Sequence, residues 1–144
     1  MLQTNHDLPD GAIKSAQGSM ANNAKDKIFS PSIAELKLTD FRSHEKAHIV
    51  TGNGIVVLSG DNGVGKTNIL EAISMLGPGR GLRTAKLSEL ARRDGATAWS
   101  VSARVRTQEE DIQIGVGIDP NAATRRLRID GQNVKGFDRL TVML

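Results

Sequence analysis

Apolar and polar residues alternate with a period of two through the second half of the chain. Apolar residues take every second position over 101–105, 112–118 and 127–129, and the positions between them are polar or glycine. Such alternation is typical of strands with one face in the core and one face in water. Short polar breaks at 108–111 and 119–122 separate the runs. The pattern therefore predicts an antiparallel β-meander.

The wet face of this predicted meander carries several arginines. Arg104 and Arg106 fall on the first run, and Arg126 and Arg128 fall on the third. Arginine in such a position more often keeps a sheet soluble than binds a ligand. Asp130-Gly131 adds a further tight-turn signal after the last run.

Three shorter strands are predicted earlier in the chain. Residues 33–38 and 47–50 are strand-like runs separated by a turn at 40–44. A glycine-rich turn then leads to the apolar run 55–58, which predicts a buried strand. We expect the first two strands to pair beside this third one.

A helical pattern follows over 68–76. Apolar residues lie almost all round it, so we expect this helix to be buried between two layers. Gly77 and the proline after it end the helix. An irregular basic loop over 78–83 follows, and then a short helix over 87–91 that ends by Gly95.

The composition describes a globular chain of 144 residues without cysteine. Disulfide scaffolds and cysteine-ligated metal sites are therefore excluded. No apolar stretch approaches the ~20 residues that span a bilayer, and the N-terminus lacks the pattern of a secretory signal. We therefore expect a cytoplasmic protein that does not enter a membrane. Residues 1–30 are polar without periodicity and predict a disordered tail; translation could instead start at Met20.

Basic residues are concentrated in one segment. Residues 76–106 hold seven basic and two acidic side chains, net +5, whereas 1–75 and 107–144 each have a net charge of −1. Such asymmetry suggests an anionic partner. A solvated basic face explains the charge equally well, and charge alone does not separate the two interpretations.

The strongest chemical signal is the sequence G-D-N-G-V-G-K-T at 60–67, a complete G-x-x-x-x-G-K-[ST] phosphate-binding loop between a strand and a helix. Its glycines allow backbone conformations in which successive N–H groups point at an anion, and the helix N-terminus adds positive charge. Lys66 is placed to bridge the β- and γ-phosphates, and the Thr67 hydroxyl to hold Mg²⁺. The candidate nucleotide-binding residues are Gly60, Asp61, Asn62, Gly63, Val64, Gly65, Lys66 and Thr67.

The motifs around this loop resemble a known family. Residues 41–44 (Phe-Arg-Ser-His), the loop 60–67 and residues 68–73 (Asn-Ile-Leu-Glu-Ala-Ile) follow the layout of the ABC-type ATPase heads of SMC, Rad50 and RecF proteins. Residues 76–84 resemble the Gly-Arg-x-x-Arg-Thr segment that follows the nucleotide helix in the RecF family, and 129–131 resembles its late Ile-Asp-Gly turn. The resemblance covers residues 33–144.

The resemblance implies a mixed α/β fold: the N-terminal half of an ABC-type P-loop ATPase head with an antiparallel β-subdomain. It implies binding of ATP and Mg²⁺, weak ATP hydrolysis, and binding of single- and double-stranded DNA in replication-gap repair, recombinational repair and the SOS response. Implied partners are RecR, RecO and a second copy in an ATP-dependent homodimer. Arg42 and Ser43 would lie near the phosphates, and the basic segment with Arg80, Arg83 and Lys86 would face DNA or the second subunit.

The chain departs from that family in what it lacks. No run of four apolar residues leads into an aspartate as a Walker B strand would, since Asp119 and Asp130 end amphipathic strands, and there is no Leu-Ser-Gly-Gly-type signature. We therefore expect residues 31–144 to be a partial P-loop domain that stops before Walker B. We also expect the last residues, 141–144, to form a core strand, and hydrolysis by this chain alone to be negligible.

A second class of function shares the phosphate-binding loop. A P-loop kinase or small-molecule NTPase would use the basic segment to hold a phosphorylated metabolite. Such enzymes usually place helices between parallel strands, whereas residues 98–130 predict a meander. A nucleotide-binding fragment without activity of its own is a third interpretation, compatible with the first.

Overall fold

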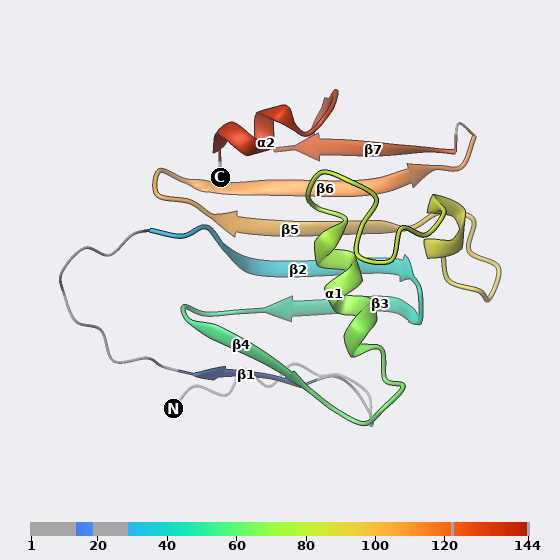
Figure 1. Ribbon diagram of the computed structural model, residues 1–144, viewed down its shortest axis with the longest axis horizontal. Helices are drawn as coiled ribbons and strands as arrows, with labels where there is room; N and C mark the ends of the chain where they lie inside the picture. The colour runs from blue at the N-terminus through green and yellow to red at the C-terminus, as the bar shows by residue number, and fades with distance from the viewer. Residues whose placement is uncertain (1–13, 19–28, 122, 144) are drawn as a thin grey trace.

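Eight strands, two α-helices and one 3-10 helix make up the fold of the computed structural model, which describes residues 14–18, 29–121 and 123–143 (Figure 1). Six strands form one antiparallel sheet in the order β3-β2-β5-β6-β7-β8, and β1 and β4 form a separate two-stranded sheet. The elements are β1 (Lys14–Gly18), β2 (Ser32–Phe41), β3 (His44–Val50), β4 (Ile55–Ser59), α1 (Lys66–Ser74), the 3-10 helix η1 (Leu87–Leu90), β5 (Ser100–Arg106), β6 (Asp111–Asp119), β7 (Thr124–Ile129), β8 (Gln132–Val134) and α2 (Asp138–Met143).

The predicted meander is confirmed as strands β5 to β7. Val101 pairs with Val116, which pairs in turn with Leu127, and all three side chains are buried. The tight turn is confirmed as well: Asp130 and Gly131 have φ of 49° and 81° and join β7 to β8. The period of two was a reliable guide because each strand has one dry and one wet face.

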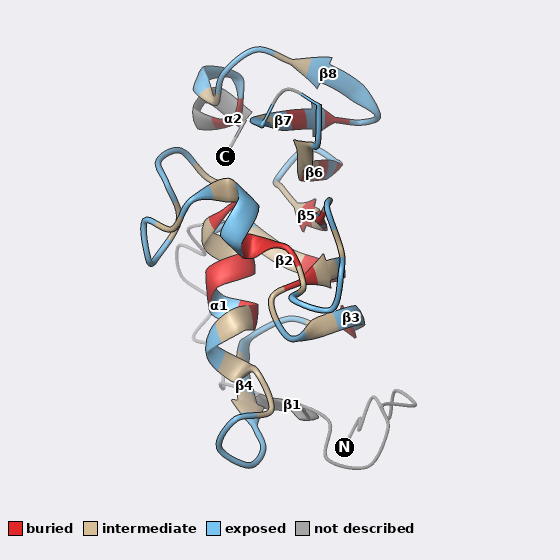
Figure 2. Ribbon diagram, turned by 90° about the vertical axis from the view of Figure 1, so that its right-hand side faces the viewer, coloured by how far each residue is buried: buried red, intermediate tan, exposed pale blue. Residues whose placement is uncertain are grey.

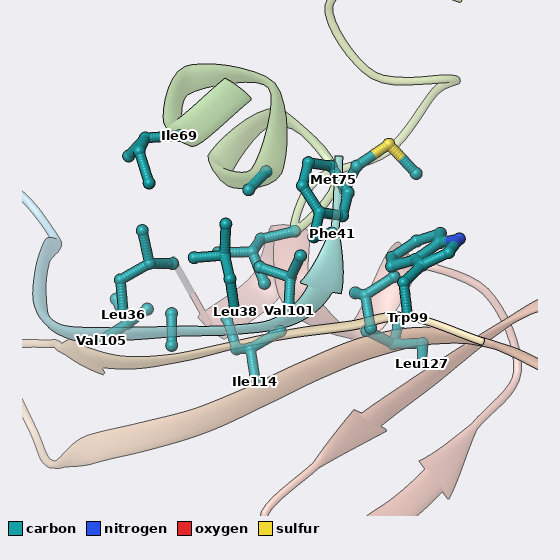
Figure 3. Packing of buried hydrophobic residues seen from close by; sticks show 14 of the residues in the cluster. Leu36, Leu38, Phe41, Ile69, Met75, Trp99, Val101, Val105, Ile114 and Leu127 are labelled. Atoms are coloured by element: carbon teal, nitrogen blue, oxygen red, sulfur yellow. The ribbon is translucent and has the colours of Figure 1, made fainter. Parts of the chain in front are cut away.

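The core lies between one face of the six-stranded sheet and helix α1 (Figures 2 and 3). Leu36 and Leu38 of β2 point toward the helix, which contributes Ile69 and Met75. Phe41 meets the ring of Trp99 edge-on, with the ring centroids 5.3 Å apart. The core therefore fixes the helix, and with it the loop that precedes the helix, on the sheet.

Helix α1 is buried on one side only. Ile69, Glu71 and Ala72 are buried, but Leu70 is 52% exposed. The expectation of burial between two layers is therefore wrong for the described residues. Apolar residues all round a short helix raised that expectation, but the sheet covers only one stripe of the helix.

Strand β4 differs from the prediction in its pairing and its burial. It pairs antiparallel with β1 and not beside β2 and β3. Its outward residues Ile55 and Val57 are 54% and 56% exposed, so the strand is not buried. A four-residue apolar run carries no information about which strand it will pair with or whether both faces will be covered.

Two expectations about the chain ends also need correction. Residues 141–143 belong to helix α2 and not to a core strand, because Asp138 starts a helical turn there and a short apolar run fits either element; residue 144 lies outside the described residues. Within the predicted tail, residues 14–18 form strand β1, whose main-chain pairing needs no particular side chains. Residues 1–13 and 19–28 of that tail lie outside the described residues.

Among the described residues, no helix is long and apolar enough to cross a membrane.

Candidate functional site

The phosphate-binding loop connects the end of β4 at Ser59 to the start of α1 at Lys66. Gly63 and Gly65 adopt φ of 92° and 95°, in the left-handed region that favours glycine. Gly65 is the N-cap of α1, and the first helical bond runs from the N–H of Ile69 to its carbonyl oxygen at 3.2 Å. The loop thus places the free N–H groups of the first helical turn at its mouth.

Lys66 folds back across the loop that precedes it. Its Nζ donates to the carbonyl oxygens of Gly60 and, at 2.9 Å, of Asp61. The ammonium group is therefore held over the start of the loop, where an anion in the hollow would meet it. Thr67 is exposed on the first turn of α1, directly after the lysine. Its hydroxyl is an oxygen ligand of the kind that Mg²⁺ prefers, so the residues present fit a phosphate-bound magnesium ion.

The turn between β2 and β3 closes onto this loop. The Nε2 of His44 lies 3.1 Å from the carbonyl oxygen of Gly65, which is an acceptor, so this nitrogen carries the proton. The Nδ2 of Asn68 donates to the Oγ of Ser43 at 2.9 Å. A Cβ on Gly65 would lie 2.6 Å from both the Ser43 Oγ and the His44 Nε2. Glycine is thus required here by close approach as well as by φ.

Arg42 connects the same turn to helix α1 through Glu71. Its Nε donates to Glu71 Oε2 at 2.9 Å and its Nη2 to Oε1 at 2.7 Å. The Nη1 of Arg42 donates to the carbonyl oxygen of Glu89 at 2.9 Å. Glu71 is 1% exposed, and Arg83 approaches it as a second cation at 3.6 Å. One buried carboxylate therefore joins the turn, the helix and the basic loop.

The two residues that the resemblance implied to lie near the phosphates make different contacts. Ser43 lies against Gly65 at the loop, whereas the guanidinium of Arg42 is engaged further along α1, at Glu71. Sequence reasoning missed Glu71, His44 and Asn68 as site residues. Glu71 is the one charged residue in the predicted helix 68–76, and this was the available signal, because such a charge is rarely buried without a cationic partner.

The basic loop after α1 is fixed at two points. The N–H of Leu82 donates to Ser74 Oγ at 2.7 Å, and the Nη1 of Arg125 donates to the carbonyl oxygen of Gly79 at 2.7 Å. Arg125 also lies 4.1 Å above the ring centroid of Phe137, and its burial lowers the pKa of its guanidinium. These contacts hold the loop against β7.

The three predicted DNA-binding residues occupy different surroundings. Arg80 and Lys86 are exposed to solvent, whereas Arg83 contacts Glu71 with a side chain that is 46% exposed. Arg80 and Lys86 are therefore the better placed of the three for contact with a large anion. Within the described part of the chain, no group of three or more His, Asp or Glu side chains could hold a metal ion.

Residues 32–142 match the family described as "RecF/RecN/SMC N terminal domain". The chain belongs to this family. Its mixed α/β architecture with an antiparallel sheet is that of the RecF ATPase head, as the resemblance implied.

Relatives of known sequence narrow the resemblance to RecF. The chain is 50% identical over 113 residues to the DNA replication and repair protein RecF of Agrobacterium fabrum, and 44% identical over 117 residues to that of Rhizobium rhizogenes. These matches cover 76% and 80% of the chain. The chain spans about 30% of the length of the curated RecF relatives it matches, so it corresponds to their N-terminal part.

Solved RecF structures have the same fold. A recombination mediator protein RecF with ATP, from the RecFOR pathway, superposes with a TM-score of 0.65 at 26% identity, covering 78% of this chain and 31% of that one. A second RecF structure, with the analogue named ATPrS, gives the same TM-score at 28% identity. Family membership and the antiparallel sheet speak against the kinase alternative.

Proposed function

We propose that this chain forms the nucleotide-binding part of a RecF-type ATPase head, which binds ATP with Mg²⁺ and acts on DNA in recombinational repair. The observation that carries the proposal is the loop at 60–67, whose Gly65 is enclosed by the Ser43–His44 turn while Lys66 spans the loop. The solved RecF relatives with ATP and an ATP analogue support the same ligand.

Each residue of the loop has a defined task in this proposal. The backbone of residues 60–65 surrounds the phosphates, Lys66 exchanges its carbonyl contacts for the β- and γ-phosphates, and Thr67 holds Mg²⁺. The magnesium ion, when bound, neutralises charge on the β- and γ-phosphate oxygens. Ser43 borders the phosphates, and Arg42 acts on the site through Glu71, by fixing the turn that encloses Gly65.

The DNA-binding part of the proposal rests on the exposed cations of the basic segment. Arg80 and Lys86 are free to meet phosphates, and Arg83 is half-exposed beside Glu71. Single- and double-stranded DNA, RecR, RecO and a second copy in an ATP-dependent homodimer are the proposed partners, supported by the RecFOR pathway of the solved relatives. We propose that residues 31–144 are a partial P-loop domain, which stops before Walker B and works in the cytoplasm, in repair after DNA damage, in replication and in the SOS response.

DNA titration at several salt concentrations tests this part. The unmodified chain should lose affinity steeply with salt, and the double variant Arg80→Ala/Lys86→Ala should bind several-fold more weakly with a smaller salt dependence. The matched control is Lys135→Ala/Arg139→Ala, which removes two exposed cations elsewhere. Indifference to DNA, together with tight binding of a small phosphorylated metabolite, would contradict the proposal and favour a kinase.

A further inference from the structure

Cations line both sides of the polar face of the six-stranded sheet, the face opposite to α1. Register places His48, Lys37, Ser102, Gly115 and Arg128 directly opposite one another on strands β3, β2, β5, β6 and β7. Paired residues point to the same side of a sheet. This row therefore begins and ends with basic side chains and has a hydroxyl and a glycine between them.

A second row, also with a cation at each end, runs beside the first. It consists of Lys46, Thr39, Ser100, Gly117 and Arg126 on the same five strands. Two cationic rims therefore face each other across a floor of small residues. The cations at the two ends are three strand spacings apart in the first row (β2 to β7), about 14 Å, and four apart in the second row (β3 to β7), about 19 Å. Figure 2 shows α1 on the other side of the sheet, and none of the described helices covers this face.

The charge of this polar face is positive overall. Three carboxylates lie on it, at Glu35, Asp111 and Asp119. Six Lys or Arg side chains accompany them: Lys37, Lys46, Arg104, Arg106, Arg126 and Arg128.

The rim arginines, Arg126 and Arg128, keep part of their side chains available to a phosphate. Arg126 pairs with Asp119, and its side chain is 56% exposed. Arg128 donates from Nε to Asn133 Oδ1 at 3.0 Å in a solvent-exposed bond. Surface bonds contribute little to stability, so a phosphate can replace the Asn133 partner of Arg128. At Arg126 a phosphate would share the exposed guanidinium with Asp119, whose side chain is 12% exposed.

We infer that this face binds duplex DNA through its phosphates, with one phosphate row on each cationic rim. A duplex presents two rows of phosphates, one on either side of each groove, and this face presents two rows of cations, one on either side of a floor of small residues. The chain has one Trp, three Phe and no Tyr, none in either row, so the face offers no platform for stacking unpaired bases. The inference deepens the proposed DNA-binding function and rests on it.

This surface is separate from the basic loop after α1. Arg125, the neighbour of Arg126 on β7, points to the opposite side of the sheet and donates to the carbonyl oxygen of Gly79 in that loop. The loop with Arg80 therefore lies on the α1 side, and the two rows lie on the other. Lys86 directly precedes Leu87, whose carbonyl oxygen accepts a hydrogen bond from Nε1 of the buried Trp99. The effect on DNA affinity can therefore be measured separately for variants on the two sides of the sheet.

Gly115 gives the sharpest test, because it sits in the middle of the floor. A Cβ there would meet only the Arg128 Cβ, at an ordinary contact distance of 3.9 Å. Gly115→Glu should therefore fold, and it places a negative charge between the rims. Its matched control is Gly115→Gln, which has nearly the same shape without the charge. Gly117 is unsuitable, since its Cβ would lie 2.9 Å from the Trp99 carbonyl oxygen.

The experiment measures binding of a 20-base-pair duplex to the 144-residue chain by fluorescence anisotropy. We expect Gly115→Glu to weaken binding at least tenfold and Gly115→Gln to change it less than twofold. Arg126→Ala/Arg128→Ala should reduce the salt slope by about 1.8, at about 0.9 for each phosphate contact. Glu35→Gln should strengthen binding several-fold, because it frees cations that Glu35 now holds.

The outcomes distinguish DNA binding by the polar face of the sheet from DNA binding by the basic segment with Arg80 and Lys86. Equal affinities for Gly115→Glu, Gly115→Gln and the unmodified chain would overturn this inference, while a loss in Arg80→Ala/Lys86→Ala would leave the proposed function standing. Tighter binding of a single strand than of the duplex, with the same Gly115 pattern, would overturn the choice of duplex. No binding by the unmodified chain would overturn both.

Discussion

Arg42 and Glu71 join the turn before the phosphate-binding loop to the helix after it through two parallel hydrogen bonds of 2.9 and 2.7 Å. The two residues are 29 positions apart in the sequence. The paired geometry matches the planar guanidinium to the carboxylate, which is the strongest form of this contact. Glu71 is buried, and Arg42 and Arg83 are the two cations that contact its carboxylate.

Removal of the Glu71 carboxylate should destabilise the protein markedly. We expect Glu71→Ala to lower the free energy of unfolding by about 3 kcal/mol, since it leaves the part-buried Arg42 guanidinium without its partner. Urea unfolding followed by the fluorescence of the single tryptophan, Trp99, measures this. Glu89→Ala is the control, because Arg42 contacts only the carbonyl oxygen of Glu89. Equal stability of the two variants would show that the pair is not structural.

Substitutions at two glycines of the loop allow the cost of backbone strain to be measured separately from the cost of close contact. Gly63 and Gly65 have nearly the same φ, but only Gly65 has neighbours where a Cβ would lie. We expect Gly63→Ala to cost about 1 kcal/mol of stability from the left-handed backbone, and Gly65→Ala to cost a further ~1–3 kcal/mol because it displaces the Ser43–His44 turn. Urea unfolding and ATP titration of both variants check this. If the two variants lose the same free energy of unfolding, the Ser43–His44 turn does not restrict the side chain at position 65.

The stability of the protein should fall in acid, because the Glu35 carboxylate then becomes protonated. Hydrogen bonds from Lys37 and His48 lower the pKa of Glu35 from 4.5 to about 2. A lowered pKa means that the ionised form stabilises the folded state, so the contribution is complete above pH 4.5 and is lost as the pH falls toward 2.

Unfolding midpoints measured at a series of pH values test this contribution. Glu35→Gln should be less stable than the unmodified chain at pH 6, and the difference should shrink between pH 4.5 and 2. Glu109→Gln, an exposed carboxylate in the β5–β6 turn, should show no such convergence. Parallel curves for the unmodified chain and Glu35→Gln would refute the role of Glu35.

Hydrolysis of ATP by the 144-residue chain should be negligible, although we propose that the chain binds ATP. The sequence offers no Walker B carboxylate to anchor the metal a second time or to orient the attacking water. A phosphate-release assay with and without Mg²⁺ measures this. Metal-dependent turnover that disappears in Lys66→Ala would contradict the expectation.

The elements that were predicted correctly from the sequence are those whose structure depends on residues close together in the chain. Strands β5 to β7 follow from alternation, and the loop with α1 follows from a motif whose glycines and lysine have fixed geometric tasks. The pairing of β4 with β1 was not predictable, because an apolar run such as 55–58 specifies neither a partner nor a covered face. Helix α2 was missed for the same reason, since four residues fit a strand or a helix equally well.

Within the site, the sequence identified the loop but not the contacts that hold it. Glu71 lies in a helix for which apolar periodicity was the only guide, and its partners Arg42 and Arg83 come from segments on either side of that helix. The enclosure of Gly65 by His44 likewise joins residues 21 positions apart. Such contacts depend on how β2, β3 and α1 pack, which a single sequence does not state.

Calorimetric titration of ATP with Mg²⁺ into the 144-residue chain, beside Lys66→Ala and Lys135→Ala, tests the proposed nucleotide site most directly. We predict saturable binding with one ATP per chain for the unmodified protein and for Lys135→Ala, and a loss of at least tenfold in affinity for Lys66→Ala, because this variant lacks the ammonium group that meets the phosphates. Equal affinities in all three proteins, or no binding by the unmodified chain, would contradict it.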